Sequence, residues 1–334
     1  MMKILVYSAK KFEVDHLLEA NAERFEITMT DRSLSIDTVD EARGASCISI
    51  FAGDDASAPV LGALHQMQVK MIAIRSAGHD NVDISKAESL GITVANVPAY
   101  SPNAIAEHAV AMMLGMSRHL VKASQQVKQH DFRVDALIGF NLEGKTVGII
   151  GTGKTGRCVA KILHGFGCNI IAFDLVKDPE LENTLGVAYT SLHEICSSSD
   201  IITIHTPLNA ASRGMICRSV IDTMKPGVML INTARGAIVN TADVIEGLLQ
   251  KKIGSFGADV YEHEKGIFFF DRRDDFPDDP MLQQLLDMPN VMVTPHQAFA
   301  TQEALKNIAD TTFENISFFA NGDRPEHALT KPNI

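Results

Sequence analysis

Three glycines between two apolar runs constrain the fold of this chain more than any other feature. Residues 151–156 read Gly-Thr-Gly-Lys-Thr-Gly, directly after the apolar run 146–150 and before a helix-compatible stretch. A second apolar run, 169–173, is followed by Asp174, 18 residues beyond the last glycine. A strand, a glycine-rich turn, a helix and an acid at the tip of the next strand together predict a dinucleotide-binding βαβ unit. The alternative, an ordinary glycine-rich turn without a ligand, leaves the position of Asp174 unexplained.

Each glycine has its own task in such a unit. Gly151 makes the tight turn, Gly153 lets the backbone approach a pyrophosphate, and Gly156 lets the helix pack close to the strand. The pyrophosphate would rest on N–H groups at the helix N-terminus, where the helix dipole favours anions. Asp174 would accept hydrogen bonds from a ribose diol and repel a 2′-phosphate, and no basic residue follows it directly. The sequence therefore predicts NAD rather than NADP as the cofactor.

Charge and composition narrow the class of partner. The 334 residues include 30 Lys and Arg against 41 Asp and Glu, a formal net charge of −11. This acidity argues against nucleic acid or an anionic membrane surface as a partner. A small anionic substrate would then need a local basic residue to hold it.

Cysteine usage and hydropathy indicate the compartment. The five cysteines are scattered without a C-x-x-C pair, a pattern typical of a reducing compartment and unlike a zinc or redox centre. The first residues read as a strand rather than a signal peptide, and no apolar stretch reaches the roughly 20 residues of a membrane span. We expect a cytoplasmic protein with no metal.

Short apolar runs alternate with helix-compatible segments along the whole chain, and the rhythm restarts at residue 146. This alternation predicts an α/β fold of two Rossmann-like, doubly wound parallel-sheet domains with a substrate cleft between them. A helical pattern near the C-terminus, 301–321, has no evident role in the second half, so we expect the chain to cross back. The predicted domains are 1–100 with 299–334 for the substrate and 101–298 for the dinucleotide.

Three strand ends in the second half carry ionisable groups. Arg235, the pair Asp259 and Glu264, and His296 each follow a short apolar run. Ligands bind at the carboxyl ends of strands in open α/β sheets. Arg235 could grip a carboxylate bidentately, and His296 could exchange a proton near neutral pH. A carboxylate beside His296 would orient the ring and favour its charged form.

Together these groups meet the needs of hydride transfer: an anchor for a carboxylate, an acid–base group and a partner that tunes it. A metal site is the weaker interpretation, because the set lacks H-x-x-x-H or H-x-x-E-H spacing. We take Glu264 as the partner of His296 and keep Asp259 as the alternative.

The motifs resemble those of the D-isomer-specific 2-hydroxyacid dehydrogenases over the whole chain. The matching segments are 76–83, 96–102, the glycine motif, 232–236, 257–262 with Glu264, and 294–299. The stretch 266–271, with the acidic insert to Pro280, resembles the lactate-specific branch of that family. The resemblance implies a cytoplasmic, fermentative interconversion of pyruvate and D-lactate with NAD, by a homodimer or a tetramer of the chain.

Two rival functions stay open at this point. A dehydrogenase for larger branched 2-hydroxy acids would share every catalytic residue and differ in pocket volume. An NAD-sensing corepressor would use the same fold as a binding module, but such proteins carry long extensions, and we expect none here.

The resemblance also assigns roles to individual residues. Arg235 would bind the substrate carboxylate and polarise its carbonyl, His296 would be the acid–base group and Glu264 its partner. Thr155 stands where the family more often has a branched aliphatic residue. The other substrate contacts would come from Ser76, Ala77, Gly78, Tyr100 and Phe299. The cofactor contacts would come from Gly151, Gly153, Lys154, Thr155, Gly156, Asp174, Thr206, Pro207, Thr233, Ala234, Arg235 and Asp259.

Overall fold

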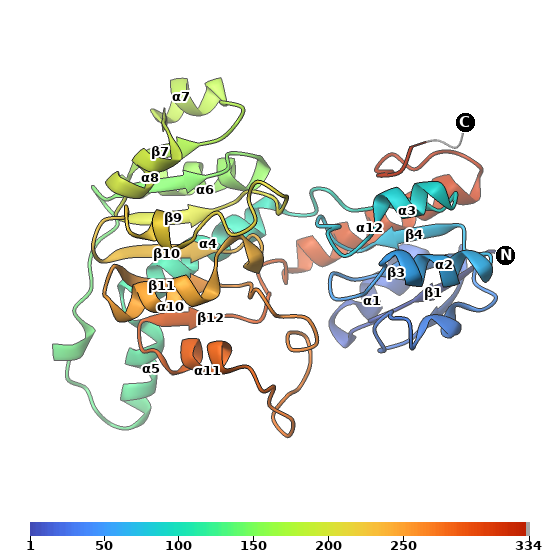
Figure 1. The fold of residues 1–334 in the computed structure, drawn as a ribbon, viewed down its shortest axis with the longest axis horizontal. Helices are drawn as coiled ribbons and strands as arrows, with labels where there is room; N and C mark the ends of the chain where they lie inside the picture. Colours follow the sequence, from blue (N-terminus) through green and yellow to red (C-terminus); the bar gives the residue numbers. More distant parts are fainter. Residues whose placement is uncertain (332–334) are drawn as a thin grey trace. The chain divides into compact units, whose positions relative to one another are not determined.

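The structure, a computed structural model, describes residues 1–331 and forms two compact units (Figure 1). Unit 1 comprises Met1–Ser101 and Ala300–Ile334, and unit 2 comprises Pro102–Phe299. Each unit holds one sheet whose strands all run parallel, with helices packed on it. The predicted fold class of two parallel α/β sheets is confirmed. No helix within residues 1–331 is long and apolar enough to cross a membrane.

Unit 1 contains a five-stranded sheet in the order β2-β1-β3-β4-β5. Its strands are β1 Lys3–Val6, β2 Glu26–Met29, β3 Cys47–Ile50, β4 Met71–Ile74 and β5 Thr93–Ala95. Its helices are α1 Lys11–Asn21, the 3₁₀ turn η1 Val39–Ala42, α2 Ala58–Gln66, α3 Ile84–Ser89 and α12 Gln302–Ala320. Strands β3 and β4 are buried throughout, as expected for a parallel sheet covered on both faces.

Helix α12 brings the end of the chain back to unit 1. It begins after Thr301, whose hydroxyl accepts the N–H of Ala304 at 3.2 Å and so caps the helix. Its residues Phe313 and Ile316 are buried in one cluster with Ile4 and Met71 of the sheet. Burying such a side chain contributes about 1.5–3 kcal/mol. The C-terminal helix is therefore part of the core of the first unit.

Unit 2 contains a seven-stranded sheet in the order β12-β11-β10-β9-β6-β7-β8. Its strands are β6 Thr146–Ile150, β7 Asn169–Phe173, β8 Ala188–Tyr189, β9 Ile201–Ile204, β10 Val228–Asn232, β11 Ile253–Ala258 and β12 Val291–Val293. Its longer helices are α4 Pro102–Ser117, α5 Leu120–Lys128, α6 Lys154–Gly165, α7 Pro179–Leu185, α8 Leu192–Ser198, α10 Thr241–Leu249 and α11 Pro280–Asp287. The shorter ones are η2 Asp135–Leu137, α9 Arg218–Ile221 and η3 Gly236–Ile238.

The strand order of unit 2 reverses between β6 and β9, so this is where successive connections diverge to opposite sides. Ligands of doubly wound sheets bind at the carboxyl ends of the strands beside such a switch point. The glycine motif follows β6 directly. The topology thus places it where a dinucleotide is expected.

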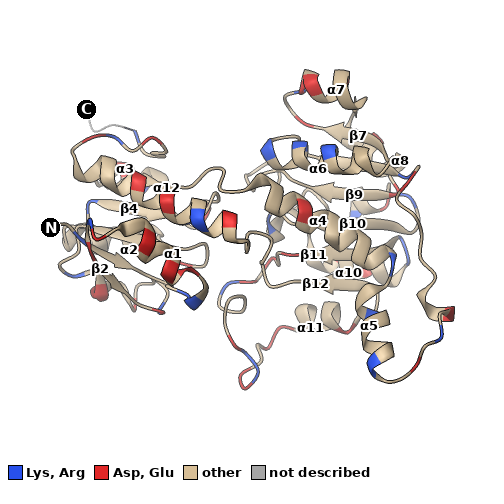
Figure 2. Cartoon of the chain, turned by 180° about the vertical axis from the view of Figure 1, so that it is seen from behind, with Lys and Arg blue, Asp and Glu red and all other residues tan. Residues whose placement is uncertain are grey.

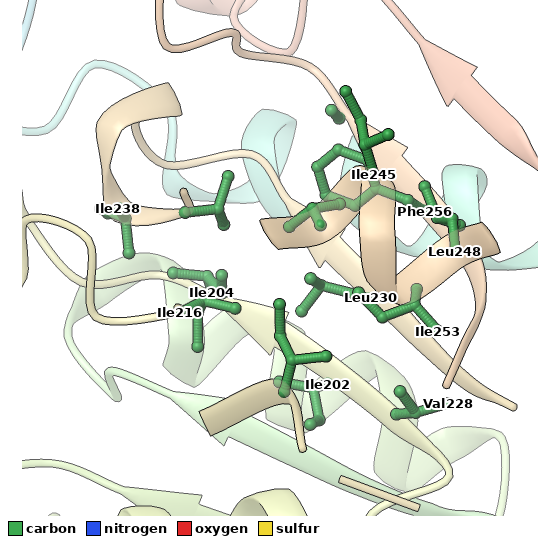
Figure 3. Packing of buried hydrophobic residues seen from close by; sticks show 14 of the residues in the cluster. Ile202, Ile204, Ile216, Val228, Leu230, Ile238, Ile245, Leu248, Ile253 and Phe256 are labelled. Atoms are coloured by element: carbon green, nitrogen blue, oxygen red, sulfur yellow. The ribbon is translucent and has the colours of Figure 1, made fainter. Parts of the chain in front are cut away.

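Both faces of the seven-stranded sheet are buried. On one face Leu230 packs in a cluster with Ile245 and Leu248 of α10 (Figure 3). On the other face its neighbour Ile231 packs in a separate cluster with residues of α4 and α6. Successive residues of β10 therefore point to opposite cores, as the two-residue period of a strand requires. Because side chains pack against both faces of the sheet, the strand ends that carry the candidate site are held in place.

Candidate functional site

The turn after β6 needs its glycines for steric reasons. Gly151 has a φ of +93°, and a Cβ there would lie 2.7 Å from the carbonyl oxygen of His205. A Cβ on Gly156 would collide with the carbonyl oxygen of Gly151. A Cβ on Gly153, the N-cap of α6, would meet nothing within 4 Å, so this position opens onto free space. The turn is packed against its own unit on one side and open at the helix N-terminus.

Asp174 lies at the end of β7, beside the glycine turn. Its Oδ2 accepts the N–H of Thr152 at 2.6 Å, and its Oδ1 accepts the N–H of Val176 at 3.1 Å. Partial burial raises the pKa of this carboxyl, but the hydrogen bonds outweigh that effect and the pKa is lowered. A negative charge is therefore held next to the turn, as a ribose diol acceptor requires.

Helix α6 carries several basic residues along its length (Figure 2). Lys154 starts the helix beside the turn, whereas Arg157 is paired with Asp178 at 2.8 Å and with Glu180. Because two carboxylates already engage Arg157, Lys154 is the basic residue of this helix best placed for an anion at the turn.

The residues after β9 and β10 complete this end of the sheet. Thr206 and Pro207 follow β9, and Thr233 and Ala234 follow β10. The hydroxyl oxygen of Thr233 is buried and has no hydrogen-bond partner within the described part of the chain. An unpaired buried hydroxyl is costly unless a ligand satisfies it. Together with the open turn, this atom fits a bound NAD.

Arg235 caps the short helix η3 at the end of β10. Its Nη1 donates to the carbonyl of Ala234 at 2.7 Å, and its own carbonyl accepts from the amide of Asn232 at 2.9 Å. A Cβ on Gly236 would collide with the backbone of Tyr261. The loops that carry Arg235 and Glu264 therefore pack directly against each other.

Glu264 and His296 form the pair that the sequence analysis expects. The ring Nδ1 of His296 lies 2.8 Å from Oε1 of Glu264, and Oε2 of Glu264 accepts the N–H of Tyr261 at 2.9 Å. The carboxylate is thus oriented by the backbone before it meets the ring. Engaging Nδ1 leaves the Nε2 side of the ring to face a substrate. Both side chains keep partial access to solvent, 25% and 17%.

The backbone of His296 is left-handed, with a φ of +56°. This conformation is uncommon outside glycine and persists only where the surroundings hold it. Asp259 holds it by accepting the N–H groups of the next two residues, Gln297 at 2.8 Å and Ala298 at 2.9 Å. The turn that aims the ring at Glu264 is therefore fixed by a second carboxylate.

Asp259 is a buried charge with several donors. Burial raises its pKa, but hydrogen bonds from His108, from Thr294 and from the N–H of Ala298, with the nearby charge of His296, lower the pKa below its usual range. The expected contact of Asp259 with the nicotinamide half stays a prediction. The contacts present are with the loop that carries His296.

Sequence reasoning missed two residues near this pair. His108, on α4, has its Nε2 3.3 Å from Oδ1 of Asp259. The ring of Phe269 lies 5.6 Å from that of His296 and 6.3 Å from that of Phe299. Neither contact has a signal in local spacing, because the partners lie far apart in the sequence.

The remaining predicted substrate residues belong to unit 1. Ser76, Ala77 and Gly78 follow β4, and the carbonyl of Ala77 accepts from the amide of Asn96 at 2.7 Å. The hydroxyl of Ser76 donates to the carbonyl of Gly78 at 2.7 Å. Tyr100 follows β5, where its carbonyl accepts from Asn307 of α12 at 2.8 Å. These residues share the carboxyl end of the first sheet. No group of three His, Cys, Asp or Glu within residues 1–331 could hold a metal.

Known proteins are similar to this chain in sequence and in fold. The family model of the NAD binding domain of D-isomer specific 2-hydroxyacid dehydrogenases matches residues 110–298. The chain is 42% identical to a 2-hydroxyacid dehydrogenase homolog of Haemophilus influenzae over 322 residues, 96% of this chain and 97% of that protein. It is 41% identical to a D-lactate dehydrogenase of Escherichia coli over 323 residues, 96% of this chain and 98% of that protein.

A solved structure of a D-lactate dehydrogenase has a similar fold. The crystal structure of the D-lactate dehydrogenase of Aquifex aeolicus, complexed with NAD and lactic acid, superimposes with a TM-score of 0.90 at 31% identity. The match covers 99% of this chain and 100% of that one.

Proposed function

The chain belongs to the D-isomer-specific 2-hydroxyacid dehydrogenases, and from this premise we propose that it reduces pyruvate to D-lactate reversibly with NADH. The observation that carries the proposal is the 2.8 Å contact between His296 and Glu264, in the same unit as the glycine turn. The similarity to D-lactate dehydrogenases supports the choice of substrate. We place the reaction in the cytoplasm and in the direction that reoxidises NADH, as in fermentation.

The dinucleotide would be held by the open end of unit 2. In this proposal the turn at 151–156, with Lys154 and Thr155, binds the pyrophosphate, and Asp174 binds the ribose. Thr206, Pro207, Thr233, Ala234 and Asp259 lie toward the nicotinamide half. When bound, NADH supplies the hydride for the carbonyl carbon.

The protein's own side chains handle the carboxylate and the proton. Arg235 grips the substrate carboxylate through its planar fork and polarises the neighbouring carbonyl. His296 donates a proton from Nε2 to the carbonyl oxygen as negative charge develops there. Glu264 holds the orientation of the ring through the hydrogen bond at Nδ1. We also assign substrate contacts to Ser76, Ala77, Gly78 and Tyr100 of unit 1 and to Phe299 of unit 2.

A homodimer is part of this proposal. Helix α5 has no buried residue, and the segment around it exposes large apolar side chains. These are Leu120, Val121, Phe132, Val134 and Ile138, between 53% and 80% exposed. Several large exposed apolar side chains on one segment favour a protein–protein interface there. Sedimentation velocity of the parent and of a Phe132→Ser, Ile138→Ser variant would show whether a second copy covers this segment.

Initial rates with purified protein test the function. NADH or NADPH is supplied with pyruvate, 2-oxobutyrate, 2-oxoisocaproate or hydroxypyruvate. We expect the highest kcat/KM for pyruvate with NADH. A preference for 2-oxoisocaproate would identify the dehydrogenase of larger 2-hydroxy acids, and NADH binding without turnover of any acid would identify a binding module.

A further inference from the structure

The carboxylate of Asp259 is buried deeply, with its side chain 1% exposed. A buried charge is costly unless it is paired and hydrogen-bonded. Three of its donors come from the strand and loop that surround His296: the hydroxyl of Thr294 at 2.5 Å and the N–H groups of Gln297 and Ala298. The fourth donor comes from a different element.

That donor is His108 of α4. Its Nε2 lies 3.1 Å from the hydroxyl oxygen of Thr294 and 3.3 Å from Oδ1 of Asp259. The hydroxyl of Thr294 has a single proton, which the short bond to Asp259 uses. The hydroxyl oxygen can therefore only accept from His108. Both contacts require a hydrogen on Nε2, so the geometry assigns the tautomer of this ring.

The contact links a helix to the acid–base loop. His108 and Thr294 are 186 residues apart, and the carboxylate between them accepts the N–H groups that follow His296. If one donor of Asp259 is lost, the carboxylate is free to turn toward its remaining donors. The left-handed backbone of His296 would then lose part of what holds it.

We propose that His108 is a positioning residue for proton transfer, acting through Asp259 on the orientation of the His296 ring. The role rests on the proposed function of the site. His108 does not exchange the proton itself; it supplies the last hydrogen bond that fixes the carboxylate behind the loop.

Two substitutions of His108 distinguish a role in positioning the carboxylate from a role in packing alone. His108→Leu keeps an apolar side chain but has no donor, and His108→Gln offers an amide N–H at nearly the reach of Nε2. We expect His108→Leu to lower kcat for pyruvate reduction about 100-fold, the cost of a small misplacement at a reacting centre. His108→Gln should recover most of this loss. The KM for pyruvate and the Kd for NADH should stay close to the parent values in both.

If His108→Leu does not fold, the polar variants His108→Gln and His108→Asn still test the proposal. His108→Asn is polar but too short to reach the carboxylate, so it should be as slow as the leucine variant while His108→Gln is fast. Glu107→Gln, a change of an exposed neighbour on α4, is the matched control and should behave like the parent. Deuterated NADH should show a larger isotope effect on kcat in the slow variants, because the chemical step becomes limiting.

A double-mutant cycle tests whether the effect passes through the carboxylate. In an Asp259→Asn background, His108→Leu should cost little more, because coupled residues are not additive. Full additivity, or equal kcat values for His108→Gln and His108→Asn, would overturn the proposal. A parent enzyme that reduces no 2-oxo acid would instead refute the proposed function. In that case ¹⁵N spectra of the His108 ring still test the assigned tautomer, and a hydrogen on Nδ1 alone would contradict it.

Discussion

The first strand of each unit runs into a helix, yet the two units use the end of that strand differently. In unit 1, β1 leads into α1 through a turn without glycine, Tyr7 to Lys10. In unit 2, β6 leads into α6 through Gly151 and Gly153. The first turn is occupied by the protein's own charges, whereas the second is kept open.

A buried ion pair between Arg75 and Glu13 fills the first turn. Arg75 is fully buried, and its Nε and Nη2 donate to the two carboxylate oxygens of Glu13 at 2.9 Å and 3.0 Å. Nη2 also donates to the carbonyl of Tyr7 at 2.8 Å, and Nη1 donates to the hydroxyl of Ser49 at 3.0 Å. Glu13 lies in the first turn of α1, so unit 1 places its own anion at the helix N-terminus. Unit 2 leaves the equivalent place open, and we propose that a ligand's phosphate binds there.

The topology of a doubly wound sheet therefore does not by itself make a binding site. The same strand–helix unit stabilises the fold when charged side chains fill the turn at its end, as Arg75 and Glu13 do. It can bind a ligand when glycines leave that turn open, as at Gly153. Substitutions of Arg235, Glu264 and His296 should therefore change catalysis at constant stability, and those in the closed turn of unit 1 should change stability without changing cofactor affinity.

The largest effect should come from His296→Ala. Loss of a general acid typically costs about 10²–10⁴-fold, so kcat for pyruvate reduction should fall by that factor at every pH. His193→Ala, an exposed position on α8, is the control and should keep the parent's rate. Steady-state rates and a thermal melt decide this prediction, and a loss below tenfold with intact folding would show that another group donates the proton.

The closed turn should respond next, in stability. Arg75→Met leaves Glu13 buried without its partner, and breaking a buried pair costs about 3–5 kcal/mol. Urea unfolding should show this loss, while titration with NADH should give the parent's affinity at temperatures where the variant is folded. Removing both charges, Arg75→Met with Glu13→Leu, should restore most of the stability. An Arg75→Met variant as stable as the parent would show that the buried pair does not stabilise unit 1.

The anchor of unit 2 should show a smaller, purely kinetic effect. Arg235→Lys keeps the charge but loses the fork, so the KM for pyruvate should rise and kcat should fall, with kcat/KM about 10²-fold lower. NADH affinity should change little. Arg213→Lys, an exposed arginine of the same unit, controls for the loss of a guanidinium. A near-normal KM would mean that the carboxylate is held elsewhere.

His205 makes the stability of the open end depend on pH. Burial lowers the pKa of this ring to about 3, so it stays neutral in the folded chain, and its Nδ1 is buried without a partner within residues 1–331. The unfolded chain binds a proton below about pH 6.5. The contribution of the neutral His205 ring to the free energy of unfolding is therefore fully present above about pH 6.5. It decreases by about 1.4 kcal/mol per pH unit as the pH drops toward 3.

Urea unfolding at pH 7 and pH 5 should thus show a loss of about 2 kcal/mol that His205→Gln removes. His193→Gln, at an exposed histidine, should keep the parent's dependence. If His205→Gln retains the full slope, the ring is not the group that titrates.

The smallest effect concerns the partner of the acid–base group. Glu264→Gln keeps the shape of the side chain but replaces the carboxylate that holds Nδ1 of His296 by a neutral amide. The kcat for pyruvate reduction should fall about tenfold, because a neutral hydrogen bond is weaker than a charge-assisted one. A steady-state rate equal to the parent's would exclude Glu264 as the partner of His296 and leave Asp259 as the candidate.

Local spacing made much of the open turn predictable. The three glycines, Asp174 and the alternation of strands and helices follow one another along the chain, and they predict the fold class and the cofactor, both of which are confirmed. The family, predicted from motifs along the whole chain, is confirmed as well. The roles of Arg235, Glu264 and His296 were proposed because each follows a strand, and the contact between the last two agrees with that hypothesis.

The closed turn could not be predicted in the same way. Arg75 and Glu13 are 62 residues apart and carry no pattern that pairs them. His108 sits in an apolar helix whose period identifies a buried face but not the partner of a polar residue within it. Such contacts depend on how sheets and helices pack in three dimensions, and one sequence contains no record of that packing.

A single-turnover isotope transfer shows directly whether the open end of unit 2 carries hydride transfer to a 2-oxo acid. Enzyme in excess is mixed with NADH deuterated at the transferred position and with pyruvate, quenched after one turnover, and the product is analysed for isotope and chirality. We expect D-lactate with deuterium at C2, in an amount equal to the NADH consumed. NADH consumed without deuterium in lactate, or lactate of the opposite hand, would contradict it.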